Sequence, residues 1–261
     1  MVIYIIMWKI IHKFPCLFCG KCELYTKCSS RGIGRETAIL YARKGYNVII
    51  NCSKESDELH SLENVLKELG APFMSFVKDV AQFDNVNGIF NILKESSMIP
   101  DIVINNAGIS YVGLLQDMTP NEWQRIIDTN LTSVFNVCKC AIPYFLHKGC
   151  GRIINISSMW GVCGASCETA YSASKGGVNS FTKALAKELA PSRIAVNAVA
   201  FGVVDTSMNA FLSDEERRDL IDEIPAGRMC TPIEAAHIIY DISNLSEYVT
   251  GQIITADGGL I

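Results

Sequence analysis

A tyrosine and a lysine four residues apart, Tyr171 and Lys175, form the first pair in the sequence that could do chemistry. On a helix this spacing places both side chains on one face. A free phenol has a pKa of about 10, and a nearby ammonium group lowers that pKa. Tyr171 could then act as a general acid or base toward a substrate oxygen. Such pairs also occur on ordinary helix faces, so the pair alone does not predict an enzyme.

A serine supplies a third group. Ser158 lies thirteen residues before Tyr171, just after the apolar run 152–156, which predicts a buried strand. Apolar residues then recur at helical spacing over 176–190 and predict a helix. A hydroxyl at the end of a strand could therefore hold the same oxygen that a phenol on the next helix protonates.

Predicted strands and helices alternate along the rest of the chain. This alternation predicts an α/β fold with a doubly wound parallel sheet, whose ligands bind at the carboxyl ends of the strands. We expect the loop 28–34, Asp79, residues 105–108 and Ser158 to meet at that edge. The predicted strands are 46–50, 73–77, 101–104 and 152–156, and the predicted helices are 35–45, 56–69, 85–93, 121–148 (with a break near Thr129 or Pro143) and 176–190.

Composition excludes several classes of protein. The 261 residues are 49% hydrophobic and 19% charged, as in a globular chain, and no repeat or linker divides them. The net charge of −4 does not favour binding to nucleic acid or to an anionic membrane. No apolar run reaches the ~20 residues that span a bilayer, and we expect a cytoplasmic protein with free thiols. Cys16, Cys19 and Cys22 resemble part of an iron–sulfur motif but lack its remainder, so no metal site is predicted.

Two glycines, Gly32 and Gly34, precede the predicted helix 35–45. Glycines there could let a pyrophosphate approach the free amides at the helix N-terminus. The strand that follows completes half of a βαβ unit, which strengthens an otherwise weak motif.

Several short motifs together resemble the classical short-chain dehydrogenase/reductase family, from about residue 28 to the C-terminus. The resemblance implies a single-domain Rossmann fold of about seven strands, a nicotinamide cofactor, and hydride transfer to a ketone or from an alcohol. Family analogy also implies a homotetramer with helices 121–148 and 170–189 at its interfaces. The motifs are Asn105-Asn-Ala-Gly108, Asn130, Ser158, Tyr171-x-x-x-Lys175, Val196-Asn197, and Thr250-Gly-Gln followed by Asp257-Gly-Gly259.

The resemblance assigns a role to each matching residue. Tyr171 would be the general acid in reduction, and Lys175 would lower its pKa and bind the nicotinamide ribose. Ser158 would bind the substrate carbonyl, and Asn130 would hold a water for proton relay. Taken alone, Asn130 could equally be a turn or capping residue, and Asp79 a surface carboxylate or cap. The implied cofactor contacts are Ser30, Arg31, Gly32, Ile33, Gly34, Asn51, Asp79, Val80, Asn106, Ala107, Gly108, Tyr171, Lys175, Val204 and Thr206.

The end of the second predicted strand bears on the choice of cofactor. An acidic residue there would bind the ribose 2′-hydroxyl of NAD. Here Asn51 is followed by no acid until Glu55, and Arg31 and Lys54 could bind a 2′-phosphate. The sequence therefore favours NADP(H).

The sequence departs from the family at its beginning. Lys27-Cys28 replaces the usual Thr-Gly of the glycine loop, and 21–27 is poor for a central strand. We therefore divide the chain into an atypical segment, 1–28, and a domain, 29–261. Our hypothesis is that the first segment comes from a shifted reading frame or a misassigned start. Phe201 also replaces a usual proline near the nicotinamide.

The substrate side leaves alternatives open. The overall pattern is most similar to 3-oxoacyl-acyl-carrier-protein reductases, which implies a carrier-bound substrate. The run 158–168 resembles reductases of an aminopentanone on a lysine of elongation factor P. There Glu168 could pair with a substrate amine, or it could cap the tyrosine helix. The altered glycine loop leaves a non-catalytic relative as a third reading, and 212–224 is predicted to form a helical lid.

Overall fold

A parallel seven-stranded sheet forms the centre of the molecule. The computed structural model describes residues 23–27, 30–209 and 212–261. Every neighbouring pair of strands is parallel, in the order β3-β2-β1-β4-β5-β6-β7. The strands are β1 (Glu23–Lys27), β2 (Asn47–Cys52), β3 (Phe73–Val77), β4 (Ile102–Asn105), β5 (Gly151–Ser158), β6 (Ile194–Phe201) and β7 (Ile253–Ala256).

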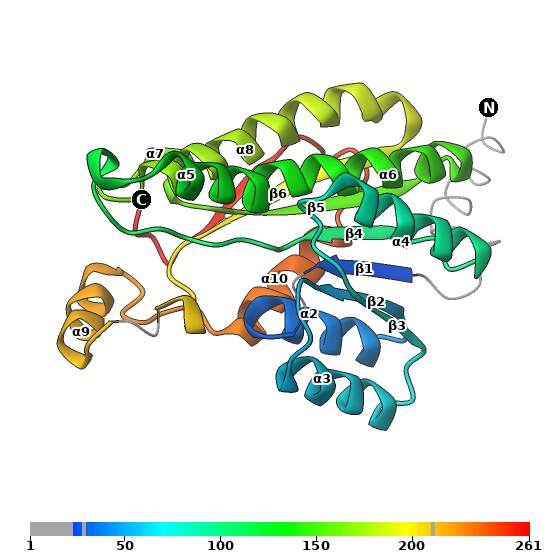
Figure 1. Ribbon diagram of the computed structural model, residues 1–261, viewed down its shortest axis with the longest axis horizontal. Helices are drawn as coiled ribbons and strands as arrows, with labels where there is room; N and C mark the ends of the chain where they lie inside the picture. Colours follow the sequence, from blue (N-terminus) through cyan, green and yellow to red (C-terminus); the bar gives the residue numbers. More distant parts are fainter. Residues whose placement is uncertain (1–22, 28–29, 210–211) are drawn as a thin grey trace, which may run out of the picture.

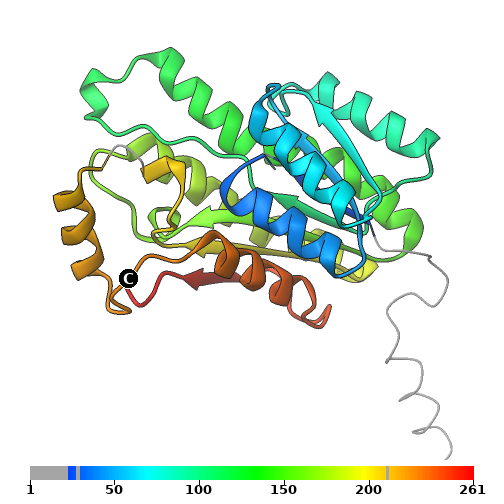
Figure 2. The same cartoon turned by 90° about the horizontal axis from the view of Figure 1, so that it is seen from below.

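Helices cover both faces of this sheet, as the predicted doubly wound fold requires (Figures 1 and 2). One buried cluster joins the sheet to α2 (Gly32–Arg43), α3 (Asp57–Glu68) and α10 (Pro232–Ser243). The cluster on the other face includes α4 (Phe83–Glu95), α6 (Ser133–Lys148) and α8 (Thr169–Leu189). The remaining helices named in Figure 1 are α5 (Pro120–Ile127), α7 (Trp160–Cys163) and α9 (Asp214–Glu223). The α/β Rossmann fold is confirmed, and no helix in the described part of the chain is long and apolar enough to cross a membrane.

Strand β1 corrects one expectation from the sequence. Its five residues pair with β2 on one side and with β4 on the other, so Leu24 lies between Val48 and Ile102. The polar pattern of 21–27 was a poor guide because pairing on both edges satisfies the backbone of a strand whatever its side chains are. The sheet thus includes residues that we assigned to the atypical segment, and the division at residue 28 stays a prediction. The Cys16–Cys22 motif lies outside the described residues.

The predicted long helix over 121–148 is interrupted near Thr129, as expected. A π-helical turn over Asp128–Thr132 separates α5 from α6, whereas Pro143 lies inside α6 without ending it. Turns of this kind are frequent at functional sites because the extra residue reorients its neighbours. Here the turn contains Asn130, whose side chain is fully buried.

Candidate active site

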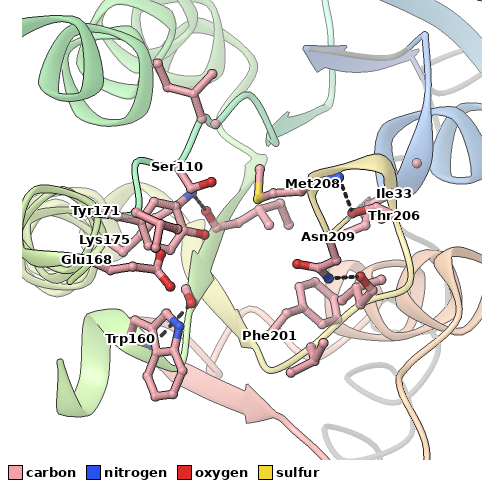
Figure 3. Close-up of a pocket in the computed structure, with 18 of the residues that line it drawn as sticks. Ile33, Ser110, Trp160, Glu168, Tyr171, Lys175, Phe201, Thr206, Met208 and Asn209 are labelled. Carbon is pink, nitrogen blue, oxygen red and sulfur yellow. Dashed lines mark hydrogen bonds between the residues drawn. The ribbon is translucent and has the colours of Figure 1, made fainter. Parts of the chain in front are cut away.

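A cavity of about 670 Å³ opens at the carboxyl ends of the strands, where we expected the functional residues to meet (Figure 3). It runs from the start of α2, past the ends of β4, β5 and β6, to α8 and the segment before α9. The cavity brings together ten of the predicted residues: Arg31, Gly32, Ile33, Asn106, Gly108, Ser158, Tyr171, Lys175, Val204 and Thr206.

The tyrosine, the serine and the lysine lie together in its wall. Ser158 is the last residue of β5, and Tyr171 and Lys175 lie in the first two turns of α8. The Tyr171 phenol and the Ser158 hydroxyl share a hydrogen bond. The Lys175 Nζ donates to the carbonyl oxygen of Ile156 at 2.8 Å and lies 5.7 Å from the centroid of the Tyr171 ring. The end of β5 and the start of α8 therefore bring the predicted trio together.

The electrostatics of the trio differ from the expectation. Burial raises the pKa of Tyr171 to about 12; the Ser158 hydrogen bond opposes this shift, and the Glu168 carboxylate adds to it. Burial also lowers the pKa of Lys175 to about 8. Among the protein's own groups, Lys175 therefore does not bring the tyrosine pKa down, since desolvation outweighs the attraction of an ammonium that is itself poorly solvated. At neutral pH the phenol carries its proton and is suited to donate it.

Asn130 connects three segments around this trio. Its Oδ1 accepts from the N–H of Ile109, and its Nδ2 donates to the carbonyl of Ile109, both at 2.9 Å. The same Nδ2 donates to the hydroxyl of Ser174, the neighbour of Lys175, at 3.0 Å. The side chain thus fixes the loop after β4 against α8. A relay water held by Asn130 stays a prediction.

The other end of the cavity fits a dinucleotide. Arg31 is the N-cap of α2 and makes no side-chain capping bond, so that helix offers its first amides and its dipole to an anion. Gly32 adopts a φ of +55°, and a Cβ there would lie 3.3 Å from Thr206 Cγ2. A Cβ at Gly108 would likewise lie 3.3 Å from Lys175 Nζ. These positions leave room for a pyrophosphate at α2 and for a nicotinamide ribose beside Lys175.

Three predicted cofactor residues, one near the end of β2 and two after β3, do not line the cavity. Asn51 points into the sheet, where its Nδ2 donates to the carbonyls of Phe76 at 3.2 Å and Lys78 at 3.1 Å. Asp79 accepts from the N–H of Ala81 at 3.0 Å and so forms a local turn, one of the two alternatives for this residue. Val80 is buried. Ser30, Gly34, Ala107 and Asn130 also lie outside the lining residues.

Sequence reasoning missed several residues of the wall. Ser110 and Tyr111 follow the predicted Asn105–Gly108 segment and extend it into the cavity. Met208 and Asn209 lie before α9, and the Nδ2 of Asn209 donates to the carbonyl of Val204 at 2.9 Å. Loops after strands β4 and β6 were the available signal, because ligands bind at those ends.

The predicted helical lid is present as α9. Leu212, just before this helix, and Leu220 within it line the cavity. An ion pair of 2.8 Å between Arg217 and Asp205 connects α9 to the loop after β6. The segment 212–223 therefore adds two apolar side chains to the cavity wall.

Glu168 does not serve as a side-chain cap. It occupies the N-cap position of α8 but makes no capping bond with its carboxylate. The carboxylate instead accepts a hydrogen bond from the Trp160 indole and faces the cavity beside Tyr171 (Figure 3). Burial raises the pKa of Glu168, and the indole partly offsets that shift.

Comparisons with known proteins agree with this geometry. Residues 28–261 match the family model described as "Enoyl-(Acyl carrier protein) reductase". The chain is 39% identical to a 3-oxoacyl-[acyl-carrier-protein] reductase, FabG, of Chlamydia muridarum, covering 88% of this chain and 94% of that protein. It is also 39% identical to the FabG of Thermotoga maritima, over 93% and 98% of the two chains.

A solved structure shows the same fold with related sequence. The crystal structure of a proposed gluconate dehydrogenase from Agrobacterium tumefaciens superimposes with a TM-score of 0.87. The two chains are 32% identical, over 92% of this chain and 96% of the other. This structural similarity and the sequence matches both extend over most of the chain, so the resemblance does not depend on single motifs. The chain belongs to the short-chain dehydrogenase/reductase family of oxidoreductases.

Proposed function

We propose that the protein reduces a ketone to a secondary alcohol with NADPH, in the manner of a 3-oxoacyl-acyl-carrier-protein reductase of the cytoplasm. The observation that carries this proposal is the Ser158–Tyr171 hydrogen bond in a cavity that continues to the uncapped N-terminus of α2. One end offers a proton donor for a carbonyl oxygen, and the other offers a site for a pyrophosphate. The FabG relatives support an acyl chain on a carrier protein as the substrate.

The chain's own contribution to the reaction is the proton. A bound nicotinamide would supply the hydride that the carbonyl carbon receives. The Tyr171 phenol gives its proton to the carbonyl oxygen, which becomes the hydroxyl of the alcohol, and the Ser158 hydroxyl orients that oxygen. The phenol then regains a proton from solvent. A protonated phenol at neutral pH is the form that reduction needs, and the raised pKa of Tyr171 supplies it.

The preference for NADPH rests on charge near the start of α2. Arg31 lines the cavity, and β2 ends at Cys52 with no acid before Glu55. A guanidinium group at this position would pair with a 2′-phosphate, which NADH lacks. We expect the substitution Arg31→Glu to weaken NADPH binding by about ten-fold or more, since it reverses one charge, while NADH binding changes little.

A fluorescence titration with NADPH separates this proposal from the non-catalytic reading. Binding, followed by oxidation of NADPH in the presence of an acetoacetyl thioester, is the expected result. No binding would favour a relative disabled at Lys27-Cys28, of which Cys28 lies outside the described residues. Binding without turnover of any ketone would also contradict the proposal.

A second candidate function is reduction of an aminopentanone carried on a lysine of elongation factor P. The Glu168 carboxylate supports it, because this group faces the substrate side of the cavity and could pair with an amine. The two candidates separate when NADPH oxidation is compared between the acetoacetyl thioester and a matched aminoketone. Preference for the thioester is expected under the first candidate, and preference for the aminoketone under the second.

A homotetramer is part of the same proposal. Helices α6 and α8 border an apolar groove of about 340 Å³ that is lined by Phe135, Ile142 and Phe181 among others. Phe135 is 46% exposed on α6, where a large apolar side chain favours association with another subunit. Light scattering of the purified chain is expected to give four times its 28.7 kDa mass, and a monomeric mass would contradict the assembly.

A further inference from the structure

Glu168 occupies the N-cap position of α8, but its carboxylate makes no capping hydrogen bond to that helix. It precedes the first residue of α8, three positions before Tyr171, and its side chain lies in the cavity wall. The Trp160 indole on α7 holds the carboxylate on the same side of the cavity as the phenol (Figure 3). The carboxylate is half-buried, so water screens its charge less than it would on an open surface.

The charges around the phenol do not cancel this carboxylate. Lys175 is the nearest cation on α8, but its ammonium bonds to the Ile156 carbonyl and it is almost fully buried. Glu122 on α5 is half-buried, and its carboxylate accepts from the backbone N–H and the hydroxyl of Thr119. The charged and titratable groups that line the same cavity are Arg31 on the α2 side, Tyr111 on the loop after β4, Glu122 and Arg125 on α5, and Glu168, Tyr171 and Lys175 on α8 or at its start.

We propose that Glu168 is a positioning residue that acts through Tyr171: its negative charge keeps the phenol in the protonated form, which donates to a ketone, up to a higher pH. The inference rests on the proposed function, because it concerns the proton donor of that reaction. Alcohol oxidation needs the phenolate, which accepts the hydroxyl proton while the hydride leaves to the oxidised cofactor. A carboxylate beside the phenol makes that phenolate harder to form.

The sign of the effect follows from the order of the titrations. The phenol titrates at alkaline pH, where the Glu168 carboxylate is ionised, so the repulsion is fully present. The contribution of Glu168 to the pKa of Tyr171 is upward, second to burial among the groups that raise it. Removing the charge should therefore move the phenol titration to lower pH and leave the burial contribution in place.

The substitution Glu168→Gln tests this inference because it removes the charge and keeps a carbonyl oxygen for the Trp160 indole. We expect the midpoint of the pH profile for oxidation of a 3-hydroxyacyl thioester with NADP⁺ to fall by about one pH unit. Glu168→Asp should restore only part of the midpoint shift, because the aspartate side chain is shorter and its carboxylate lies farther from the phenol.

Glu122→Gln is the matched control. It removes another carboxylate from the lining of the same cavity, while glutamine still completes a capping box with Thr119. The control should leave the midpoint of the oxidation profile where it is. An equal shift in both variants would show a general effect of net charge and would overturn the role of Glu168.

A spectroscopic titration separates failure of this inference from failure of the proposed function. The tyrosinate absorbance of Tyr171 is obtained as the difference between a protein and its Tyr171→Phe derivative. The midpoint should be lower in Glu168→Gln than in the parent chain, whether or not any substrate is turned over. Equal midpoints would overturn the inference and leave the reductase proposal intact; a lower midpoint with no ketone reduced would overturn the proposed function alone.

Discussion

The ammonium group of Lys175 lies 2.8 Å from the carbonyl oxygen of Ile156, two residues before Ser158 on β5. This bond fixes the lysine beside the tyrosine, but the position is almost fully buried and lowers the pKa of Lys175 to about 8. The lysine is thus held beside the tyrosine at a cost in desolvation, a combination that is typical of charged groups in active sites.

Lys175 should make stability depend on pH. Its pKa is lower in the folded chain than in the unfolded chain, so the unfolded state binds more protons between those two values, and folding becomes more favourable as pH rises. The stability of the natural chain relative to Lys175→Met should therefore increase from about pH 8 to about pH 10.5, by on the order of 3 kcal/mol. Chemical denaturation of both proteins across this range measures it. A constant difference would contradict the buried-ammonium interpretation.

Removing the phenolic hydroxyl should abolish proton donation. We expect Tyr171→Phe to lower kcat for ketone reduction by about 100- to 10,000-fold, because general acid catalysis contributes that much, with little change in the Kd of NADPH. Tyr111→Phe is the control, since it removes a second phenolic hydroxyl from the same cavity. Steady-state rates and cofactor titrations of both variants decide the matter. Comparable losses of kcat in both variants would show that altered packing, and not lost proton donation, causes the effect.

Asn130 should be a determinant of stability. Its buried carboxamide bonds to both backbone groups of Ile109 and to the Ser174 hydroxyl, and Asn130→Ala leaves these partners unsatisfied. We expect a loss of about 2–4 kcal/mol in the free energy of unfolding, measured by urea denaturation. Asn85→Ala, which removes one exposed bond to the carbonyl of Asp79, should cost much less. A loss below about 1 kcal/mol for Asn130→Ala would contradict the bridging role.

Gly32 should control cofactor binding through close approach. Gly32→Ala combines a strained positive φ with a Cβ 3.3 Å from Thr206 Cγ2, at the start of α2. Gly45→Ala has a φ of +86° but no atom within 4 Å of the new Cβ, so it reproduces the strain without the crowding. Both should lose about 1 kcal/mol of stability. Only Gly32→Ala should raise the Kd of NADPH, by about ten-fold, and equal Kd values would show that crowding at Gly32 is irrelevant.

Most of the fold and the central trio followed from local pattern. Alternating apolar runs and helical periodicity were enough to place Ser158 at the end of a strand and Tyr171 near the start of a later helix, because both signals are local in the sequence. The position of the cavity could also be predicted, because ligands bind at the carboxyl ends of the strands in a parallel sheet. The break near Thr129 was also foreseen, although its π-helical form was not.

The exceptions share a physical cause, since each depends on neighbours distant in sequence. The pKa of Tyr171 is set by burial under the whole cavity wall, which the spacing to Lys175 does not report. The Asn51 carboxamide donates to the carbonyls of Phe76 and Lys78 and does not line the cavity. Glu168 was predicted either to cap α8 or to meet a substrate, and only the indole of Trp160 shows that the side chain turns to the cavity.

Strand β1 has a consequence for how the molecule unfolds. It is the only connection by strand pairing between β2–β3 and β4–β7 among the described residues. On one face, α2 and α10 also span the divide, through the bond between the Tyr41 and Ser243 hydroxyls. A chain shortened to begin after residue 28 would keep that helix contact but leave two half-sheets with open edges. Strand β1 therefore adds to the helix and core contacts that let the two halves unfold as one cooperative unit.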